Sequence, residues 1–384
     1  MSLFGDERKT DERWMGFSES EYSYLRRSSS PIAHNVRTLL EACLEKYPLT
    51  EQSDLISRIR SKRGYYSATF ELILHEWLRR QGYALAPHPV LPNGEATHPD
   101  FLVTCPDGSQ LYLEAICTKE DDGRNPSPEA LKTNALDVLY RAHHPDFLIG
   151  VTSIGNPITQ PSGRKLRDFV ITWLNKLDIN QIIHDYSGNI DAYPVIHWRH
   201  ECWDVEIRAI PFKDKEDNPA RGLFGTFTPE GKLVNGWKPI RDAINKKTHK
   251  YGNLDLPIVV AVNIQGIGID RMDEIQSLYG QEQVLITEHE SKIETIVSHM
   301  SNGAWRKGFD RHFEKCSGAW LFDNFTPFTF AHRRQTLYLN PKATLPVPAG
   351  FIQMPYAQFE SGELTYHEGK TFKEVFVLSE LWPE

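Results

Sequence analysis

Residues 98–119 read H-P-D-F-L-V-T-C-P-D-G-S-Q-L-Y-L-E-A-I-C-T-K, and this stretch decides the fold. Two apolar runs, Phe101–Cys105 and Leu111–Cys117, flank Pro106-Asp107-Gly108, which is a strong signal for a hairpin turn. Both runs are apolar at successive positions, as in strands that are buried on both faces of a sheet. The stretch therefore predicts a β-hairpin at the centre of a covered sheet.

The same hairpin places two acidic residues opposite each other. If the three turn residues form the loop, Cys105 faces Ser109, and Asp100 lies directly opposite Glu114 on one face. Two buried carboxylates held this close need a shared proton or a cation, and oxygen ligands of this kind suit Mg²⁺, Mn²⁺ or Ca²⁺. The alternative is a strand end at the rim of the sheet, where both carboxylates are solvated, and a slip of one residue in register would separate them.

The segment before the hairpin predicts a helix over Tyr65–Gln81. Its apolar residues recur at helical spacing and form one stripe: Tyr66, Phe70, Ile73, Leu74, Trp77 and Leu78. Glu71 lies at the edge of this stripe, from which it can reach a site on the sheet. Gly82 is suited to end the helix, and Tyr83–Leu91 is expected to form the first strand.

After the hairpin, Ser127 and Pro128 are suited to begin a helix that runs to about His143. Asp146–Ser153 then reads as a buried strand that closes the unit. The predicted order is helix, three strands, helix, strand.

With Glu71, the Pro99-Asp100 pair and Glu114 on these elements, the segment Tyr65–Ser153 resembles the PD-(D/E)XK, or restriction-endonuclease-like, nuclease superfamily. The resemblance covers well under half of the chain. It implies an α/β fold with a mixed sheet, and it implies that Glu71, Asp100 and Glu114 bind one or two divalent cations, Mg²⁺ or Mn²⁺. In that family a lysine two positions after the last acid assists the attacking water.

Here the lysine position holds Ile116, so the chain departs from the family pattern. Either catalysis is lost or another lysine has taken over. Lys119 follows shortly after but points to the opposite face of a regular strand. Lys132, at the border of the next helix's apolar stripe, is the preferred substitute, and an ordinary solvated lysine is the alternative for that residue.

The whole chain has 384 residues and a formal net charge of −8, with 40% hydrophobic and 24% charged residues. We expect an N-terminal helical segment over 1–63, the nuclease-like core over 64–155, and a mixed α/β region over 156–384 that extends the same sheet or stands apart. The five scattered cysteines indicate neither a zinc site nor a disulfide framework, and a cytoplasmic protein fits them. No stretch is long and apolar enough for a membrane span.

The acidic net charge argues against a protein that coats nucleic acid through bulk charge, but it leaves room for a local basic groove. The best candidate is the cluster of Arg58, Arg60, Lys62 and Arg63, because it leads into the helix that carries Glu71. A solvated surface is the alternative. Nucleic acid is the expected partner, with DNA preferred, and a homodimer remains open.

These observations predict a metal-dependent nuclease that hydrolyses phosphodiester bonds, in defence, restriction or repair. Ile116 favours a rival from another class, namely a nuclease-fold protein that binds nucleic acid or acts as a scaffold without catalysis. A second rival is a two-carboxylate hydrolase such as a glycosidase, which is disfavoured because facing strand positions leave no room for an intervening water.

Overall fold

The computed structural model describes the chain except for residues 1, 6, 17, 119–127, 187–189, 213–221, 230–235, 266–269, 290–291, 306–313 and 361–362, and for 128–130, 190, 227–229, 284–289 and 292–298 it describes only the backbone. The chain forms two compact units. The first consists of Met1–Gly5, His34–Glu120 and Asn235–Glu384, and the second consists of Asp6–Ala33 and Asp121–Val234. The second unit thus consists of two segments that interrupt the first unit at two places.

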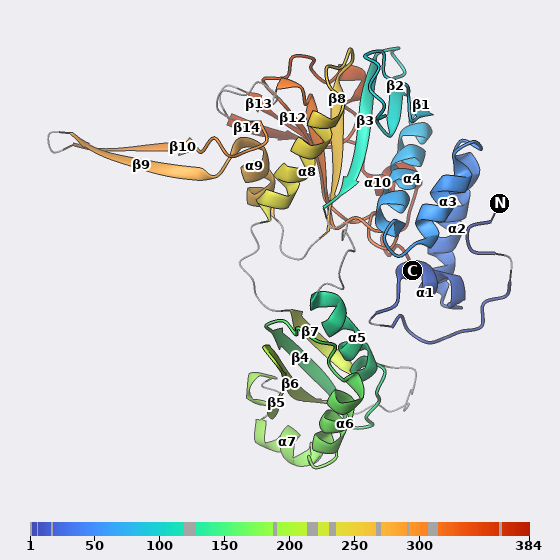
Figure 1. Cartoon of the computed structure of the whole chain (residues 1–384), viewed down its shortest axis with the longest axis vertical. Coiled ribbons are helices and arrows are strands. Elements are labelled where there is room, and N and C mark those ends of the chain that lie inside the picture. The colour runs from blue at the N-terminus through green and yellow to red at the C-terminus, as the bar shows by residue number, and fades with distance from the viewer. Residues whose placement is uncertain are drawn as a thin grey trace. The chain divides into compact units, whose positions relative to one another are not determined.

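The first unit contains an eight-stranded mixed sheet, several helices and a two-stranded ribbon (Figure 1). Its helices are α2 (Pro31–Lys46, of which the first turn belongs to the second unit), α3 (Gln52–Arg60), α4 (Tyr65–Arg80), α8 (Trp237–Lys250), α9 (Arg271–Tyr279) and α10 (Phe372–Phe376). Its strands are β1 (Ala84–Pro87), β2 (Phe101–Thr104), β3 (Gln110–Cys117), β8 (Ile258–Ile264), β9 (Glu282–His289), β10 (Lys292–His299), β11 (Gly318–Asp323), β12 (Gln335–Leu339), β13 (Tyr356–Glu360) and β14 (Glu363–His367). The large sheet has the order β1-β2-β3-β8-β11-β12-β13-β14.

The predicted hairpin is confirmed together with its register. Phe101 pairs with Leu113 and Thr104 pairs with Gln110 across antiparallel β2 and β3. The mixed α/β class, the α4 helix and the first strand are confirmed as well, although β1 is shorter than the expected strand. Local signals were sufficient for these elements because β1, β2 and β3 pair in chain order and α4 is defined by its own helical spacing.

The strand that follows β3 in the sheet is not the expected one. β8 pairs parallel to β3, with Glu114 beside Val260, and α8 provides the crossover before it. The prediction that Asp146–Ser153 closes this sheet is therefore wrong. A parallel neighbour requires a crossover connection, and here that connection contains the larger segment of the second unit, Asp121–Val234.

Helices cover both faces of the large sheet. Phe70 and Trp77 of α4 contact Phe322 and Trp320 of β11, with ring centroids 4.9 and 5.2 Å apart. Leu321, between those two residues, packs instead with the apolar residues of α8 and α9. Since successive side chains of a strand point to opposite faces, α4 lies on one face and α8 with α9 on the other.

The ribbon of β9 and β10 extends away from the sheet of the first unit (Figure 1). Its strands pair antiparallel over eight positions, from Glu282 opposite His299 to His289 opposite Lys292. No other strand of the described chain joins this ribbon in its sheet.

The second unit has its own four-stranded sheet with the order β5-β6-β4-β7. Its elements are α1 (Glu21–Arg27), α5 (Pro128–Tyr140), β4 (Phe147–Ile154), α6 (Gly163–Leu174), α7 (Ile179–Tyr186), a short 3-10 helix (Ile190–Ala192), β5 (Val195–His200), β6 (Trp203–Pro211) and β7 (Phe224–Pro229). Residues of α5, α6, β4 and β6 share one hydrophobic core. The structure thus divides differently from the expected segments 1–63, 64–155 and 156–384, because α5 and β4 are part of this second core.

Candidate active site

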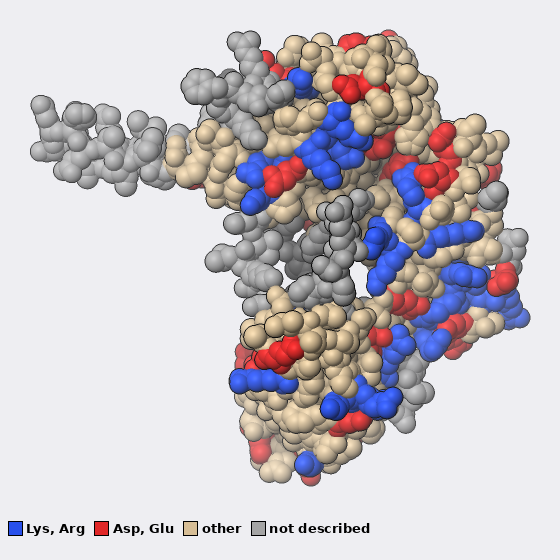
Figure 2. All heavy atoms as spheres, in the orientation of Figure 1, with Lys and Arg blue, Asp and Glu red and all other residues tan. Residues whose placement is uncertain are grey.

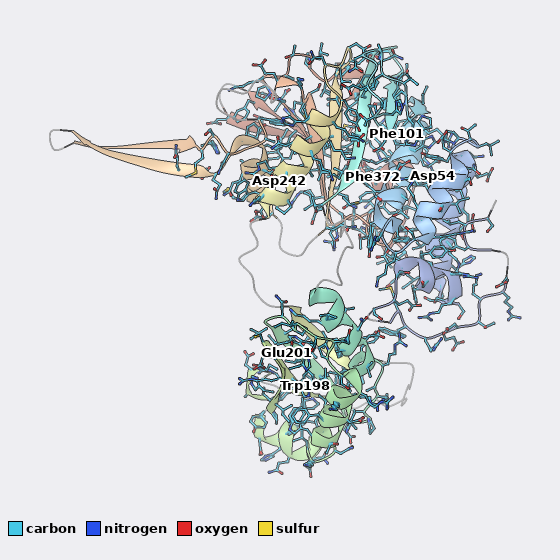
Figure 3. The ribbon with its side chains drawn as sticks, in the orientation of Figure 1. Asp54, Phe101, Trp198, Glu201, Asp242 and Phe372 are labelled. Atoms are coloured by element: carbon cyan, nitrogen blue, oxygen red, sulfur yellow. The ribbon has the colours of Figure 1, made fainter. Side chains whose placement is uncertain are left out.

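Three acidic residues of the first unit lie near one another at the β2–β3 side of its sheet, where the charges of Glu71 and Glu114 both act on Asp100. Glu71 lies on α4, Asp100 immediately precedes β2, and Glu114 lies on β3. Glu71 and Glu114 are 3% and 1% exposed. Phe101, the first residue of β2, and Asp54 on α3 are labelled in Figure 3 and mark the elements around this site.

The hairpin register joins Asp100 to Glu114 through the backbone. The Asp100 N–H donates to Glu114 Oε2 at 3.2 Å, and the Ala115 N–H donates to Asp100 Oδ2 at 2.7 Å. The two carboxylates therefore occupy the facing positions that the sequence predicted, with Glu114 buried and Asp100 partly buried.

Each of the two glutamates has a cationic and a phenolic partner. Arg58 donates to both oxygens of Glu71, from Nη1 at 2.6 Å and from Nη2 at 3.1 Å, and Tyr47 Oη donates to Glu71 Oε1 at 2.7 Å. Lys247 Nζ of α8 donates to Glu114 Oε1, and the Oη of Tyr251, which caps the C-terminus of α8, donates to Glu114 Oε2. Lys247 and Tyr251 reach the same carboxylate because residues four apart share a helix face.

Asp100 differs from both glutamates, since no ion pair involves it among the described residues. Burial raises the pKa of Asp100 well above its ordinary value, and the nearby charges of Glu114 and Glu71 raise it further.

Burial also raises the pKa of Tyr47 and of Tyr251, so both remain hydroxyl donors at neutral pH. His75, whose ring lies 4.8 Å from that of Tyr47, has its pKa lowered to about 4 by burial and adds no positive charge. Arg58 and Lys247 balance the charges of two of the three carboxylates. The third can therefore be balanced by a proton or by a cation.

The donor set has the chemistry that a hard divalent cation requires, because three carboxylates supply only oxygen atoms. In the described part of the chain, however, no three acidic, histidine or cysteine side chains already stand in a metal-binding arrangement. Arg58 and Lys247 hold two of the three acids. Binding of a cation would thus require these two side chains to release carboxylate oxygens.

Neither lysine that the sequence favoured is seen to contact the three acids among the described residues. Lys132 lies on α5 in the second unit, where it is 5% exposed, and Lys119 lies outside the described residues. Ile116 packs at the edge of the core between the sheet and α8, on the face that carries Glu114. Lys247 was not predicted. The sequence shows it only as part of a basic run, Lys246–Lys250, on a helix followed by a buried strand.

The residues of the predicted basic cluster before α4 differ in their contacts and in their exposure to solvent. Besides Glu71, Arg58 contacts Asp54, with Nε 2.7 Å from Oδ2, and Arg60 donates from Nη2 to the Ser2 carbonyl at 3.0 Å. Lys62 and Arg63 are exposed in the turn between α3 and α4. Arg58 is thus a partner of the acidic site rather than a surface cation.

A second basic surface lies on α8. Lys238, Lys246, His249 and Lys250 are exposed there, and Figure 2 shows Lys and Arg side chains gathered over this helix in the first unit. Asp242, labelled in Figure 3, is an acidic residue among them. This surface belongs to the same helix as Lys247.

No helix in the described residues is long and apolar enough to cross a membrane. Comparisons with known proteins give the chain no relative: no protein-family model, no curated protein and no solved structure matches it.

Proposed function

We propose that the chain is a metal-dependent nuclease whose acidic site is completed by Lys247. The observation that carries the proposal is the meeting of Glu71, Asp100 and Glu114 with a lysine at Glu114. The lysine comes from α8 instead of the strand position held by Ile116. An acid trio with one ammonium group is the set that the resemblance to PD-(D/E)XK nucleases implies.

Asp100 and Glu114 would hold the cation, and Glu71 would complete the set after exchange of Arg58. Asp100 supports this assignment because two carboxylates act on it and no ion pair in the described chain includes it. When bound there, Mg²⁺ or Mn²⁺ would polarise the scissile phosphate and lower the pKa of the attacking water.

The side chains of the chain itself would act around that centre. The Lys247 ammonium would stabilise the negative charge that develops on the phosphate, or hold the attacking water by a hydrogen bond. Tyr251 and Tyr47 would orient Glu114 and Glu71 through their hydroxyl groups. We treat these two tyrosines as positioning residues.

The exposed cations of α8 give a route for the substrate. Lys238, Lys246 and Lys250 are exposed on the helix that delivers Lys247 to Glu114. Phosphate backbones bind such surfaces through lysine and arginine, with affinity that depends steeply on salt. A nucleic-acid strand bound along α8 would thus have its phosphates near the three acidic residues. We propose DNA as this nucleic acid.

The test is a cleavage assay with plasmid, single-stranded DNA and RNA, with and without Mn²⁺. The wild type should cut at least one polymer only when Mn²⁺ is present, and Asp100→Asn should be inactive. Lys46→Ala, which removes an exposed lysine on α2, is the control and should cut normally. Metal-independent cleavage that persists in Asp100→Asn would refute the assignment.

One observation favours a second function. Arg58 and Lys247 already neutralise two of the three acids, as in a fold that keeps its charges paired without a metal. A non-catalytic nucleic-acid-binding protein would show salt-dependent binding without cleavage. It would also show the same melting temperature with and without Mn²⁺, whereas a nuclease should be stabilised by the cation.

A further inference from the structure

A hollow of about 450 Å³ lies in the first unit, apart from the acidic site. Its lining comes from the start of α9, the segment before β12, the strands β13 and β14, and the start of α10. None of the acidic-site residues takes part. The volume falls within the range of about 300–1,000 Å³ that is typical of small-molecule sites.

The lining is rich in positive charge although the chain as a whole carries −8. Four cationic side chains line the hollow, Arg271, Arg333, Arg334 and Lys373, against a single carboxylate, Glu368. Such a local excess of positive charge selects anions over neutral ligands.

Contacts to the surrounding protein fix some of these cations. Arg334 donates from Nη2 to Glu274 Oε1 at 2.8 Å, and the same buried carboxylate accepts the Tyr338 hydroxyl at 2.7 Å. Lys373 pairs with Glu380 at 2.5 Å. These two cations are therefore largely neutralised, and they shape the wall more than they attract a ligand.

Arg271 and Arg333 are differently placed. The guanidinium carbon of Arg271 lies 4.1 Å from the ring centroid of Tyr366, and none of the ion pairs between described residues includes Arg271. Arg333 has a side chain that is 40% exposed, and its Nη1 lies 3.8 Å from Asp323 Oδ2, which is longer than a good hydrogen bond. Both cations thus keep donors that a phosphate group can accept in the bidentate geometry of arginine.

The hollow also offers flat aromatic surfaces. Tyr356 and His367 face each other on β13 and β14, with centroids 4.4 Å apart and an angle of 9° between their planes. Together with Tyr366 they line the same hollow as the arginines. A nucleotide can use both features, because its base stacks on an aromatic ring while its phosphate binds an arginine. Inorganic phosphate and an acidic side chain have no base and would use the arginines alone.

We propose that this hollow binds a nucleotide, with the phosphate on Arg271 and Arg333 and the base against Tyr356, His367 or Tyr366. The ligand is a nucleoside monophosphate group, either free or as part of a strand. The proposal goes beyond the nuclease assignment and does not depend on it, since the two sites share no residue.

The test is calorimetric titration of the intact protein with the 5′-monophosphates of adenosine, guanosine, cytidine and uridine, and with inorganic phosphate, in EDTA. At least one nucleotide should bind saturably. Arg333→Gln should weaken binding by about tenfold to a hundredfold, as expected for a lost charge-assisted hydrogen bond. The matched control is Arg167→Gln in the second unit, whose side chain is also 40% exposed and which should bind like the wild type.

Further arms separate the parts of the proposal. Tyr356→Leu should weaken nucleotide binding by about tenfold and leave phosphate binding unchanged. Equal affinity for phosphate and for every nucleotide would overturn the assignment of a base site. Absence of saturable binding at millimolar concentration, or unchanged binding in Arg333→Gln, would overturn the whole proposal.

A short single-stranded oligonucleotide identifies the source of the ligand. Competition with the bound mononucleotide supports a strand as the natural ligand, and lack of competition supports a free nucleotide. Asp100→Asn should bind nucleotides normally, so that failure of the nuclease assignment and failure of this one give different results.

Discussion

Replacement of Lys247 by alanine should separate the candidate active site from an inert arrangement of charges. The change removes the ammonium group that donates to Glu114, whose side chain is 1% exposed, while the Tyr251 hydroxyl stays on the other oxygen. Loss of one partner of a buried ion pair costs about 3–5 kcal/mol. The Lys247 side chain is 18% exposed and the tyrosine bond remains, so we expect about 2–3 kcal/mol.

In a unit of this size that loss lowers the melting temperature by about 4–12 °C. If Lys247 also acts on the substrate, the cleavage rate should fall by about 10²–10⁴-fold at a temperature where the variant is folded. Lys46→Ala on α2 is the control for both measurements and should resemble the wild type. Wild-type cleavage in folded Lys247→Ala would refute the catalytic role.

The ion pair itself is measured by a double-mutant cycle. Glu114→Gln combined with Lys247→Ala should destabilise the protein by less than the sum of the single changes, because the second change removes an already unpaired partner. Additive losses in the cycle would show that Glu114 and Lys247 do not interact.

Ile116→Lys in the Lys247→Ala background should restore part of the activity, since Ile116 shares the sheet face of Glu114.

Three other predictions follow from the site and its surroundings. Asp100→Asn should stabilise the metal-free protein at neutral pH, because burial and two carboxylates raise the native pKa above the unfolded value near 3.9. The native state then binds more protons between the two pKa values and loses stability as pH rises through that window. The advantage of the variant in thermal unfolding with EDTA should therefore vanish near pH 4, and equal melting at neutral pH would contradict it. Lys246→Ala and Lys238→Ala should each flatten the log–log salt dependence of duplex binding by about 0.9, and an unchanged slope would assign that lysine to solvated surface. Lys132→Met should cleave at the wild-type rate, since Lys247 already donates to Glu114, and a large loss would point back to the lysine that the sequence favoured.

The sequence predicted the site where its geometry is local. The turn at Asp107-Gly108 sets the pairing of β2 with β3, and that register brings Asp100 opposite Glu114 within 15 residues. The apolar stripe of α4 placed Glu71 at its edge in the same way. Short-range patterns were sufficient here because the hairpin strands are adjacent in the chain and helical spacing alone sets the α4 stripe, although α4 itself packs on distant β11.

The lysine was missed because its placement depends on a distant pairing. The sequence pattern favoured the first helix and strand after the hairpin, α5 and β4, over the later pair α8 and β8 that the sheet uses. The distinguishing signal is burial on both faces: every residue of Ile258–Ile264 is buried, as a central parallel strand requires, whereas Phe147–Ile154 leaves positions on one face partly exposed. In the sequence, I-V-V-A-V-N-I is more uniformly apolar than F-L-I-G-V-T-S-I.

Because the second unit interrupts the first, the residues of the candidate active site are synthesised at different times. Glu114 and Lys247 are 133 residues apart, so at about 5–20 residues per second the ribosome needs roughly 7–27 s to add the lysine after the last acid. During that interval the nascent chain carries the acid trio but lacks α8 and the β8 strand beside it. The growing polypeptide thus holds the acidic half of its site without the ammonium half, and Lys247 enters only after every residue of the inserted unit has been made.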